Sequence, residues 1–206
     1  MQRGRTANRP LLDTPQARNT FRLASHFKKD TPVDVFDAIA HRYSYRGSFT
    51  DRAVPREDLR KIVQAGLQAP SGCNEQTTSF VIVDDPKMLA EIAAIVNTPV
   101  CYTAQAMILC VTDSGSMFKR ISYHLEDCAA AVQNILLAVT ALGYATVWLD
   151  GVLRFGNVAG RLNSLLDIPS RKTVQVVLPL GVPVAHGMRV GKLPFDKRAW
   201  FNRYGE

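Results

Sequence analysis

From about residue 33 onward, the spacing of hydrophobic and polar positions alternates between the pattern of helices and that of strands. Apolar residues recur every three or four positions where we expect amphipathic helices, and they form short β-branched runs where we expect strands. The predicted helices span residues 33–41, 55–69, 86–96, 123–143 and 153–166, the last a weaker helix interrupted by Gly156 and Gly160. The predicted strands span residues 79–84, 107–111, 146–150 and 174–182. Because no repeat, linker or low-complexity tract divides residues 33–185, the pattern predicts one α+β domain.

Local signals mark the ends of several predicted helices. Pro55 begins the second helix, and Asp85 caps the third, with Pro86 at its first position. Gly143 is suited to end the longest helix because glycine readily adopts the left-handed conformation found there. After Asp127 this longest helix is apolar on nearly every side, which is typical of a helix buried all round. In a chain of 206 residues, this favours a central helix that is partly covered by a second subunit.

The charge is concentrated at the two ends of the chain. The net charge is +7, from 25 Lys and Arg against 18 Asp and Glu. Residues 1–32 carry seven basic and two acidic side chains, and residues 186–206 carry five and two. The remaining 33–185 therefore has 13 basic against 14 acidic, a balance of −1. This division predicts a near-neutral domain between a basic N-terminal arm and a basic C-terminal arm.

Composition excludes several classes of protein. At 47% hydrophobic and 21% charged residues, the chain is globular rather than disordered or fibrous. No apolar run is long enough to span a bilayer, and no apolar stretch follows the basic opening as in a secretory signal, so we expect a cytoplasmic protein. The four cysteines form no CxxC pair and the four histidines are scattered, so we expect reduced, mostly buried thiols and no metal site.

Basic arms bind nucleic acid in some proteins, through the phosphates, and in others they are solvated or extend over a partner subunit. Residues 1–32 contain no Lys or Arg cluster interleaved with aromatic residues. This absence favours an arm over a nucleic-acid function.

Four polar segments lie at the edges of predicted elements, whereas GxSxG, Walker and GxGxxG motifs are missing. The first segment, residues 42–46, places two guanidinium groups and a hydroxyl where they can meet a phosphate. It is equally typical of a helix C-terminus, where Arg offsets the helix dipole. The second segment, residues 69–76, carries Asn74 and Gln76, whose amides can address the edge of a heterocycle. Its Pro, Ser, Gly and Asn are also typical of a polar turn without a ligand.

The third and fourth segments are shorter. Residues 149–151 end a predicted strand, and Gly151 permits close approach of the backbone to a ligand. Residues 189–194, in the basic C-terminal arm, contain Arg189 and Lys192. These two cations would add to a phosphate site or simply be solvated.

The order of these segments resembles the nitroreductase family of FMN-dependent oxidoreductases. Residues 41–83 are similar to that family's RRSxRxF-like segment followed by VPxxxLxxILxAAxxAPSxxNxQPWxFVVV. Residues 126–149 are similar to its central D-xx-A-A-xx-N-xx-LAA-xx-LGLGxxW segment, and residues 177–184 to its closing strand with LGxP. The likeness runs from about Asp34 to Pro194.

The resemblance implies a nitroreductase-like α+β fold: a central mixed β-sheet flanked by helices, with a long buried central helix. It also implies a domain-entwined homodimer with one FMN in each of two clefts at the subunit interface. The implied domains are an N-terminal arm (1–32), an FMN-binding domain (33–185) and a C-terminal arm (186–206).

On matching positions, the resemblance implies flavin contacts from residues of all four polar segments. One chain would supply Arg42, Ser44 and Arg46, with the backbone of Tyr43, and its partner would supply Pro70, Ser71 and Gly72. Asn74 and Gln76 would address the isoalloxazine. The backbone N–H of Asp150 would point to flavin N5, with Gly151 beside it, and Arg189 and Lys192 would grip the phosphate.

One departure from the family pattern concerns the second segment. The family's Gln-Pro-Trp is Gln76-Thr77-Thr78 here, so a proline and a large aromatic residue are lost. The loss affects rigidity and packing near the cofactor loop more than FMN binding itself.

The resemblance implies an enzyme in which NAD(P)H reduces the flavin, leaves, and is replaced by an electron-poor acceptor such as a nitroaromatic or a quinone. Such a ping-pong cycle needs no side-chain acid or base, since the flavin carries the hydride chemistry. Two alternatives remain: an FMN-dependent dehalogenase or substrate-specific dehydrogenase of the same fold, and a flavin-storing or nucleic-acid-associated protein that is not an enzyme.

Overall fold

The computed structural model describes residues 33–113, 115, 121–185, 187 and 189–205. The predicted N-terminal arm, residues 1–32, lies outside the described residues, and the C-terminal arm is described in part. The α-helices are α1 (Val35–His41), α2 (Arg56–Leu67), α3 (Pro86–Val96), α4 (His124–Ala141) and α5 (Val158–Leu165). The strands are β1 (Thr78–Val83), β2 (Ala106–Asp113), β3 (Ala145–Thr146) and β4 (Lys172–Gly181). The 3₁₀ turns are η1 (Gly72–Asn74), η2 (Pro99–Thr103), η3 (Gly151–Arg154) and η4 (Phe195–Lys197).

The capping signals in the sequence act as expected. The Asp85 side chain caps the N-terminus of α3 by accepting a hydrogen bond of 2.9 Å from the backbone N–H of Met88. Pro86 occupies the first turn of this helix. Gly143 follows the C-terminus of α4 with a φ of +77°. That left-handed value is accessible to glycine at little cost, so the predicted helix end is confirmed.

The sheet has the strand order β1-β2-β4-β3. The prediction of a mixed sheet is wrong for the described strands, because all three pairings are antiparallel. Val83, at the end of β1, lies opposite Met107, near the start of β2. The excursion through α3 and η2 therefore returns the chain to the end of the sheet from which it left, and β2 must run against β1.

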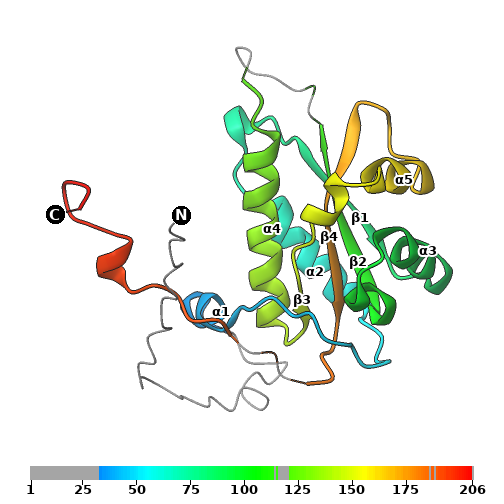
Figure 1. Cartoon of the computed structure of the whole chain (residues 1–206), viewed down its shortest axis with the longest axis horizontal. Helices are drawn as coiled ribbons and strands as arrows, with labels where there is room; N and C mark the ends of the chain where they lie inside the picture. Colours follow the sequence, from blue (N-terminus) through cyan, green and yellow to red (C-terminus); the bar gives the residue numbers. More distant parts are fainter. Residues whose placement is uncertain (1–32, 114, 116–120, 186, 188, 206) are drawn as a thin grey trace, which may run out of the picture.

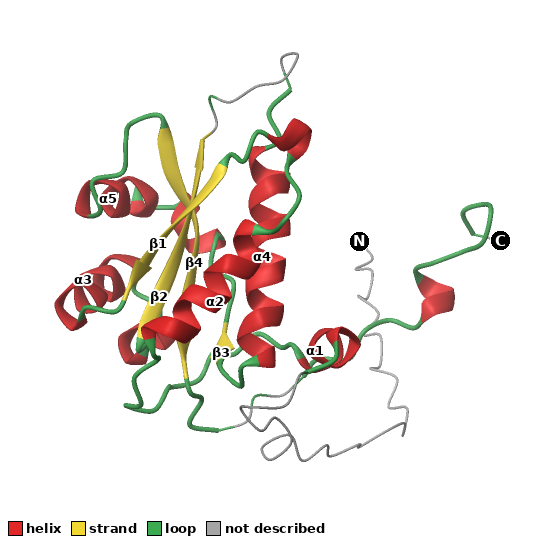
Figure 2. Cartoon of the chain, turned by 180° about the vertical axis from the view of Figure 1, so that it is seen from behind, coloured by secondary structure: helices red, strands yellow, loops and turns green. Residues whose placement is uncertain are grey.

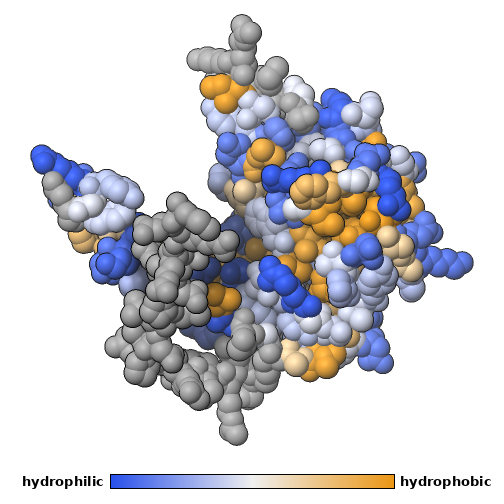
Figure 3. All heavy atoms as spheres, in the orientation of Figure 1, coloured by the Kyte–Doolittle hydropathy of each residue, from blue (hydrophilic) through white to orange (hydrophobic). Residues whose placement is uncertain are grey.

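Helices cover both faces of the sheet, in three layers (Figures 1 and 2). On β2, Met107, Leu109 and Val111 face the cluster that includes α3 and α5, whereas the alternate residues face α2 and α4. This alternation follows from the two-residue period of a strand, and it makes β2 buried on both sides. Apolar side chains also reach the surface, where Figure 3 shows an orange patch in the region of α3 and α5.

The longest helix, α4, is buried on one side only within a single chain. Residues such as Ile135 and Val139 are buried against the sheet, but Leu125, Ala129 and Gln133 are exposed. Covering of this outer side by a second subunit therefore stays a prediction. No helix in the described part of the chain combines the length and the hydropathy needed to cross a bilayer.

Two predicted elements are shorter than expected. The strand predicted over 146–150 is reduced to β3, with one further bridge between Leu149 and Val177. The helix predicted over 153–166 is divided into η3 and α5. Gly156 and Asn157 separate them with φ values of +56° and +55°, which no α-helix accommodates.

Candidate cofactor site

The first polar segment lies beside the stretch of chain that leads from β4 toward the fourth. The backbone N–H of Tyr45 donates to the carbonyl of Thr146 at 2.9 Å, which attaches the segment after α1 to the edge strand β3. Further along, Val184 donates to Ser48 at 3.1 Å, and Phe49 bridges Pro183. The chain after β4 thus runs antiparallel to the segment after α1, and the C-terminal arm begins beside it.

Gly187 packs tightly against the ring of Tyr43. A β-carbon at Gly187 would lie 2.4 Å from Cε2 of the Tyr43 ring, so only glycine fits there. Burial raises the pKa of the Tyr43 phenol, and a hydrogen bond from the Gly187 backbone partly offsets this rise. Beyond Gly187 the arm continues past α1, as both ribbon views show (Figures 1 and 2).

Four cationic residues lie near Tyr43 and Gly187 in the sequence. Arg42 and Arg46 flank Tyr43 in sequence, and Arg189 and Lys192 follow Gly187. None of the four makes an ion pair with another residue in the described part of the chain. Arg42 also serves as the C-cap of α1, through a backbone bond to Ala38, so the helix-end interpretation of this residue is correct. The capping uses only its backbone, which leaves the guanidinium group available.

The second polar segment forms a loop whose conformation is unusual. Cys73, Asn74 and Gln76 have φ values of +51°, +58° and +50°. Residues other than glycine rarely adopt this left-handed conformation, which persists only where surrounding contacts impose it. Gly72, just before them, packs so closely on the Tyr123 ring that a β-carbon there would lie 2.4 Å from Cδ2.

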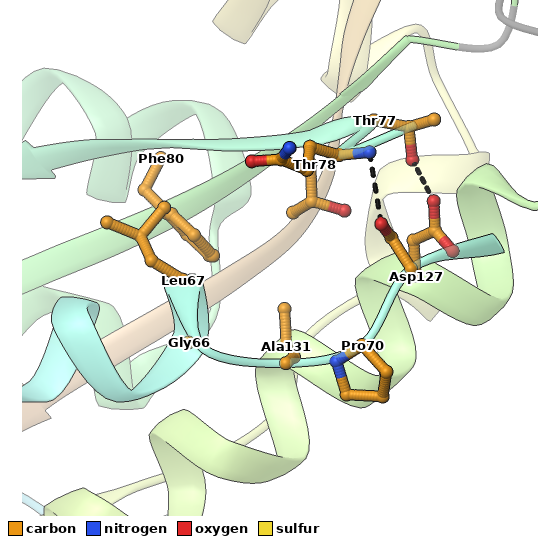
Figure 4. A pocket seen from close by; sticks show the side chains of 11 residues that line it. Gly66, Leu67, Pro70, Thr77, Thr78, Phe80, Asp127 and Ala131 are labelled. Atoms are coloured by element: carbon orange, nitrogen blue, oxygen red, sulfur yellow. Dashed lines mark hydrogen bonds between the residues drawn. The ribbon is translucent and has the colours of Figure 1, made fainter. Parts of the chain in front are cut away.

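The loop is held by Asp127, a buried residue in the first turn of α4. One carboxylate oxygen accepts from the backbone N–H of Gly72 at 2.8 Å, and the other accepts from the Thr77 hydroxyl at 2.6 Å. Figure 4 shows the bond between Thr77 and Asp127 as a dashed line, with Pro70 on the stretch of loop below it. Ser71 adds a third anchor, since its hydroxyl accepts from the backbone N–H of Gln76 at 3.1 Å.

A cavity of about 130 Å³ lies between this loop, α2, β1 and α4. Exposed Leu67, Pro70 and Gln76 lie among its lining residues, together with buried Thr77, Asp127 and Ala131. The cavity is therefore open on the loop side and closed against the core. Its lining contains three residues that the sequence assigns to the flavin: Pro70, Ser71 and Gln76.

The third polar segment ends in a short 3₁₀ turn. Among the hydrogen bonds of the described residues, none is donated by the backbone N–H of Asp150. A β-carbon at Gly151 would meet nothing within 4 Å, so the backbone here is accessible. The Asp150 carboxylate is engaged elsewhere, because Nη2 of Arg154 donates to it at 2.8 Å.

The second segment is remote from the first within one chain. Gly72 is bonded to Asp127 at the beginning of α4, whereas Tyr45 is bonded to Thr146 just beyond its end. With 18 residues, α4 is about 27 Å long. The third segment lies nearer to the first, since Asp150 is four residues beyond Thr146, or about 13 Å of extended chain. One chain thus brings the first segment beside the start of the C-terminal arm, and it leaves the second segment at the other end of α4.

The sequence reasoning missed three residues that organise the site: Thr77, Asp127 and Arg154. Asp127 is the aspartate of the family's D-xx-A-A-xx-N segment, but that pattern gives no hint of its bonds to a loop 50 residues earlier. Thr77 was noted only because it stands where the family pattern has a proline, and the hydrogen bond from its hydroxyl to Asp127 was not anticipated. Arg154 follows Asp150 at the four-residue spacing of an ion pair, and this signal was available in the sequence.

Fold and site together define a class: α+β proteins with a helix-covered antiparallel sheet, an unpaired cationic segment and an amide-bearing loop. The family model described as "Nitroreductase family" matches residues 39–100 and 96–182, which is more than half of the chain. The chain belongs to the nitroreductase family.

Individual relatives agree with this assignment. "Putative NADH dehydrogenase/NAD(P)H nitroreductase" of Methanothermobacter thermautotrophicus is 34% identical over 75% of this chain and 80% of its own length. "NADPH-flavin oxidoreductase" of Vibrio harveyi is 28% identical over 82% of this chain and 73% of its own. The crystal structure of the Bacteroides thetaiotaomicron "Putative NADH dehydrogenase/NAD(P)H nitroreductase" has a TM-score of 0.74 and 28% identity. It covers 84% of this chain and all of that one.

Proposed function

We propose that the chain is an FMN-dependent oxidoreductase that takes a hydride from NAD(P)H and passes it to an electron-poor acceptor by a ping-pong mechanism. Its family membership makes it an NAD(P)H-dependent flavin oxidoreductase. The identity of the flavin as FMN, the acceptor class and the order of steps are our proposal.

The observation that carries the choice of FMN is a set of cations that are near Tyr43 and Gly187 in sequence and make no ion pair in the described part of the chain. Arg42 and Arg46 lie within three residues of Tyr43, and Arg189 and Lys192 lie two and five residues after Gly187. Guanidinium groups bind phosphate through planar, bidentate hydrogen bonds, and a mononucleotide offers a phosphate at one end. The donor set therefore fits a phosphate-bearing flavin.

The remaining assignments follow from the geometry of the other segments. Asn74 and Gln76 lie on a loop whose amides are exposed, as binding of a heterocycle edge requires. The free backbone N–H of Asp150 suits an acceptor nitrogen of the ring, and Gly151 leaves room for a close approach. Bound flavin supplies the hydride chemistry, and these residues bind and orient it.

We infer that the site is completed by a second copy of the chain. The 27 Å estimated above for α4 separates the cationic segment from the loop that begins at Pro70. A homodimer would place the loop of one subunit over the cations of the other. The exposed side of α4, with Leu125 and Ala129, offers an apolar face for that association.

The first test is the absorption spectrum and oligomeric state of the purified chain. We expect yellow protein, release of FMN on denaturation and a dimer by light scattering. Anaerobic NADH or NADPH should then bleach the flavin, and a panel of quinones, nitroarenes and halophenols should restore its colour. A colourless monomer that does not bind added FMN would refute the proposal.

A matched pair of variants tests the phosphate site. Arg46→Ala should weaken FMN binding by about 10- to 100-fold, since hydrogen bonds to charged groups are worth about 1.5–3 kcal/mol. Arg161→Ala, which removes an exposed cation from α5, should leave the FMN dissociation constant unchanged. Equal effects of the two substitutions would contradict the assignment of Arg46.

A further inference from the structure

The cavity behind the loop contains a polar group without a partner. The hydroxyl of Thr78 is buried, with less than 1 Å² of its oxygen exposed, and it has no hydrogen-bond partner among the described residues. Figure 4 shows its side chain pointing into the space between β1 and the stretch that carries Pro70. A buried hydroxyl without a partner costs free energy, so a ligand that bonds it gains affinity.

The cavity has the size of a single ring. An apolar cavity of about 150 Å³ holds one benzene molecule, and this cavity measures about 130 Å³. Leu67, Phe80 and Ala131 provide apolar surface. The polar lining residues are Ser71, Gln76, Thr77, Thr78 and Asp127, and among them the buried hydroxyl of Thr78 has no partner in the described part of the chain. The size of the cavity results from the small residue at position 78, where the related family pattern has Trp; an indole in place of this side chain would fill the space.

The charge of the cavity restricts what it accepts. Asp127 lines it, and both carboxylate oxygens are already engaged, with Gly72 and Thr77. No cation of the described chain is among the lining residues. An anionic ring would therefore meet a buried negative charge without compensation, whereas an uncharged ring would not.

We propose that this cavity holds the non-reacting ring of an uncharged, fused two-ring acceptor such as a naphthoquinone. The inference rests on the proposed function, because Pro70, Ser71 and Gln76 border both the cavity and the proposed flavin. The quinone ring lies at the flavin, and the benzo ring enters the cavity against Phe80. Overall, NAD(P)H gives a hydride and the medium a proton, and the quinone becomes a hydroquinone while NAD(P)⁺ is released.

The test compares 1,4-naphthoquinone with 1,4-benzoquinone, which lacks the second ring. Thr78→Trp fills the cavity and should lower the naphthoquinone-to-benzoquinone ratio of kcat/KM by about tenfold or more. A change of this size is expected because the variant can no longer bury several carbons of the second ring. Taking the ratio within each protein cancels the intrinsic difference in reactivity. The FMN dissociation constant and the rate of flavin bleaching by NAD(P)H should stay as in the wild type.

Two further variants separate shape from hydrogen bonding. Thr78→Val keeps the space and removes only the hydroxyl, so it should preserve the preference for naphthoquinone. It should lose any additional preference for 6-methoxy-1,4-naphthoquinone, whose ether oxygen lies on the benzo ring away from the carbonyls and can accept from the Thr78 hydroxyl. Thr112→Val is the matched control: Thr112 pairs with Thr78 in the sheet and also has an unpartnered hydroxyl, but it does not line the cavity. It should change neither preference.

The outcomes divide cleanly. If Thr78→Trp leaves the ratio unchanged while the flavin binds and bleaches normally, the cavity does not hold the acceptor and this inference fails alone. If Thr78→Trp instead weakens FMN binding or slows bleaching, the cavity belongs to the flavin or the nicotinamide, and the inference also fails. If the wild-type protein binds no flavin, the proposed function itself is wrong.

Discussion

Replacement of Asp127 by Ala tests how the flavin-binding loop is held. The substitution removes the acceptor of two hydrogen bonds, at 2.8 Å from the Gly72 N–H and at 2.6 Å from the Thr77 hydroxyl. A buried donor left without a partner costs about 1–3 kcal/mol. We therefore expect the free energy of unfolding to fall by about 2–4 kcal/mol, since water reaches part of the released loop.

The loop itself should lose more than global stability indicates. Cys73, Asn74 and Gln76 hold left-handed conformations that cost about 1–3 kcal/mol each when not imposed by contacts. Without Asp127 the loop can relax, and the amides of Asn74 and Gln76 lose their positions. The FMN dissociation constant, measured by flavin fluorescence, should then rise at least tenfold under conditions where urea titration shows the protein fully folded.

Substitutions at Thr77 guard against a variant that fails to fold. Thr77→Val removes one of the two bonds and should cost about 1–3 kcal/mol. Thr77→Ser keeps the hydroxyl and should recover the FMN affinity of the wild type, at a cost of about 1 kcal/mol for the lost methyl group. If the Val and Ser variants bind FMN equally well, the bond from Thr77 to Asp127 does not position the loop.

Three further predictions concern other contacts. Tyr144→Phe removes a 2.6 Å hydrogen bond to buried Asp58 and should lower the free energy of unfolding by about 1–3 kcal/mol. Burial and Asp58 raise the pKa of Tyr144 above its ordinary value of 10. The stability that this hydrogen bond contributes is therefore present below pH 10 and is lost as the pH rises further. Urea titrations at pH 8 and 10.5 should show this loss in the wild type but not in Tyr144→Phe. Gly72→Ala forces a β-carbon against the Tyr123 ring and should weaken FMN binding at least tenfold; FMN binding equal to that of the wild type would show that the close packing of Gly72 does not position the loop. Of the four cysteines, only Cys73 is exposed. Native protein should therefore react with one equivalent of a thiol reagent, and unfolded protein with four. If bound FMN does not slow the reaction of native protein, the loop does not lie against the flavin as proposed.

The sequence was sufficient to predict most elements because their signals are local. The cap at Asp85, the left-handed Gly143 and the β-branched run of β1 each depend on neighbours within a few positions. Such signals survive without tertiary knowledge. Gly156 was recognisable as an interruption of the weak helix predicted over 153–166. The left-handed φ of Asn157 beside it has no such signal, and Gly160 lies inside α5 rather than at a break.

Strand direction was not predictable in the same way. The mixed sheet was implied by the family resemblance and not by the elements themselves, because pairing direction depends on where the excursion between two strands ends. Here α3 and η2 together carry the chain back to the end of the sheet at which β1 finished. Short 3₁₀ turns have weak sequence signatures, so this correction required the structure.

The pair Thr77-Thr78 shows why the site could be only partly anticipated. From the sequence, loss of a proline and an aromatic residue implied a looser, less packed loop. The structure separates the two effects. Thr77 replaces the stiffness of a proline ring with a hydrogen bond to Asp127, which a proline cannot donate. Thr78 leaves space that no neighbour fills, together with an unpartnered hydroxyl. Rigidity of the loop and room beside it are therefore independent properties of adjacent residues, and substitutions at position 77 should alter cofactor affinity while substitutions at position 78 alter the choice of acceptor.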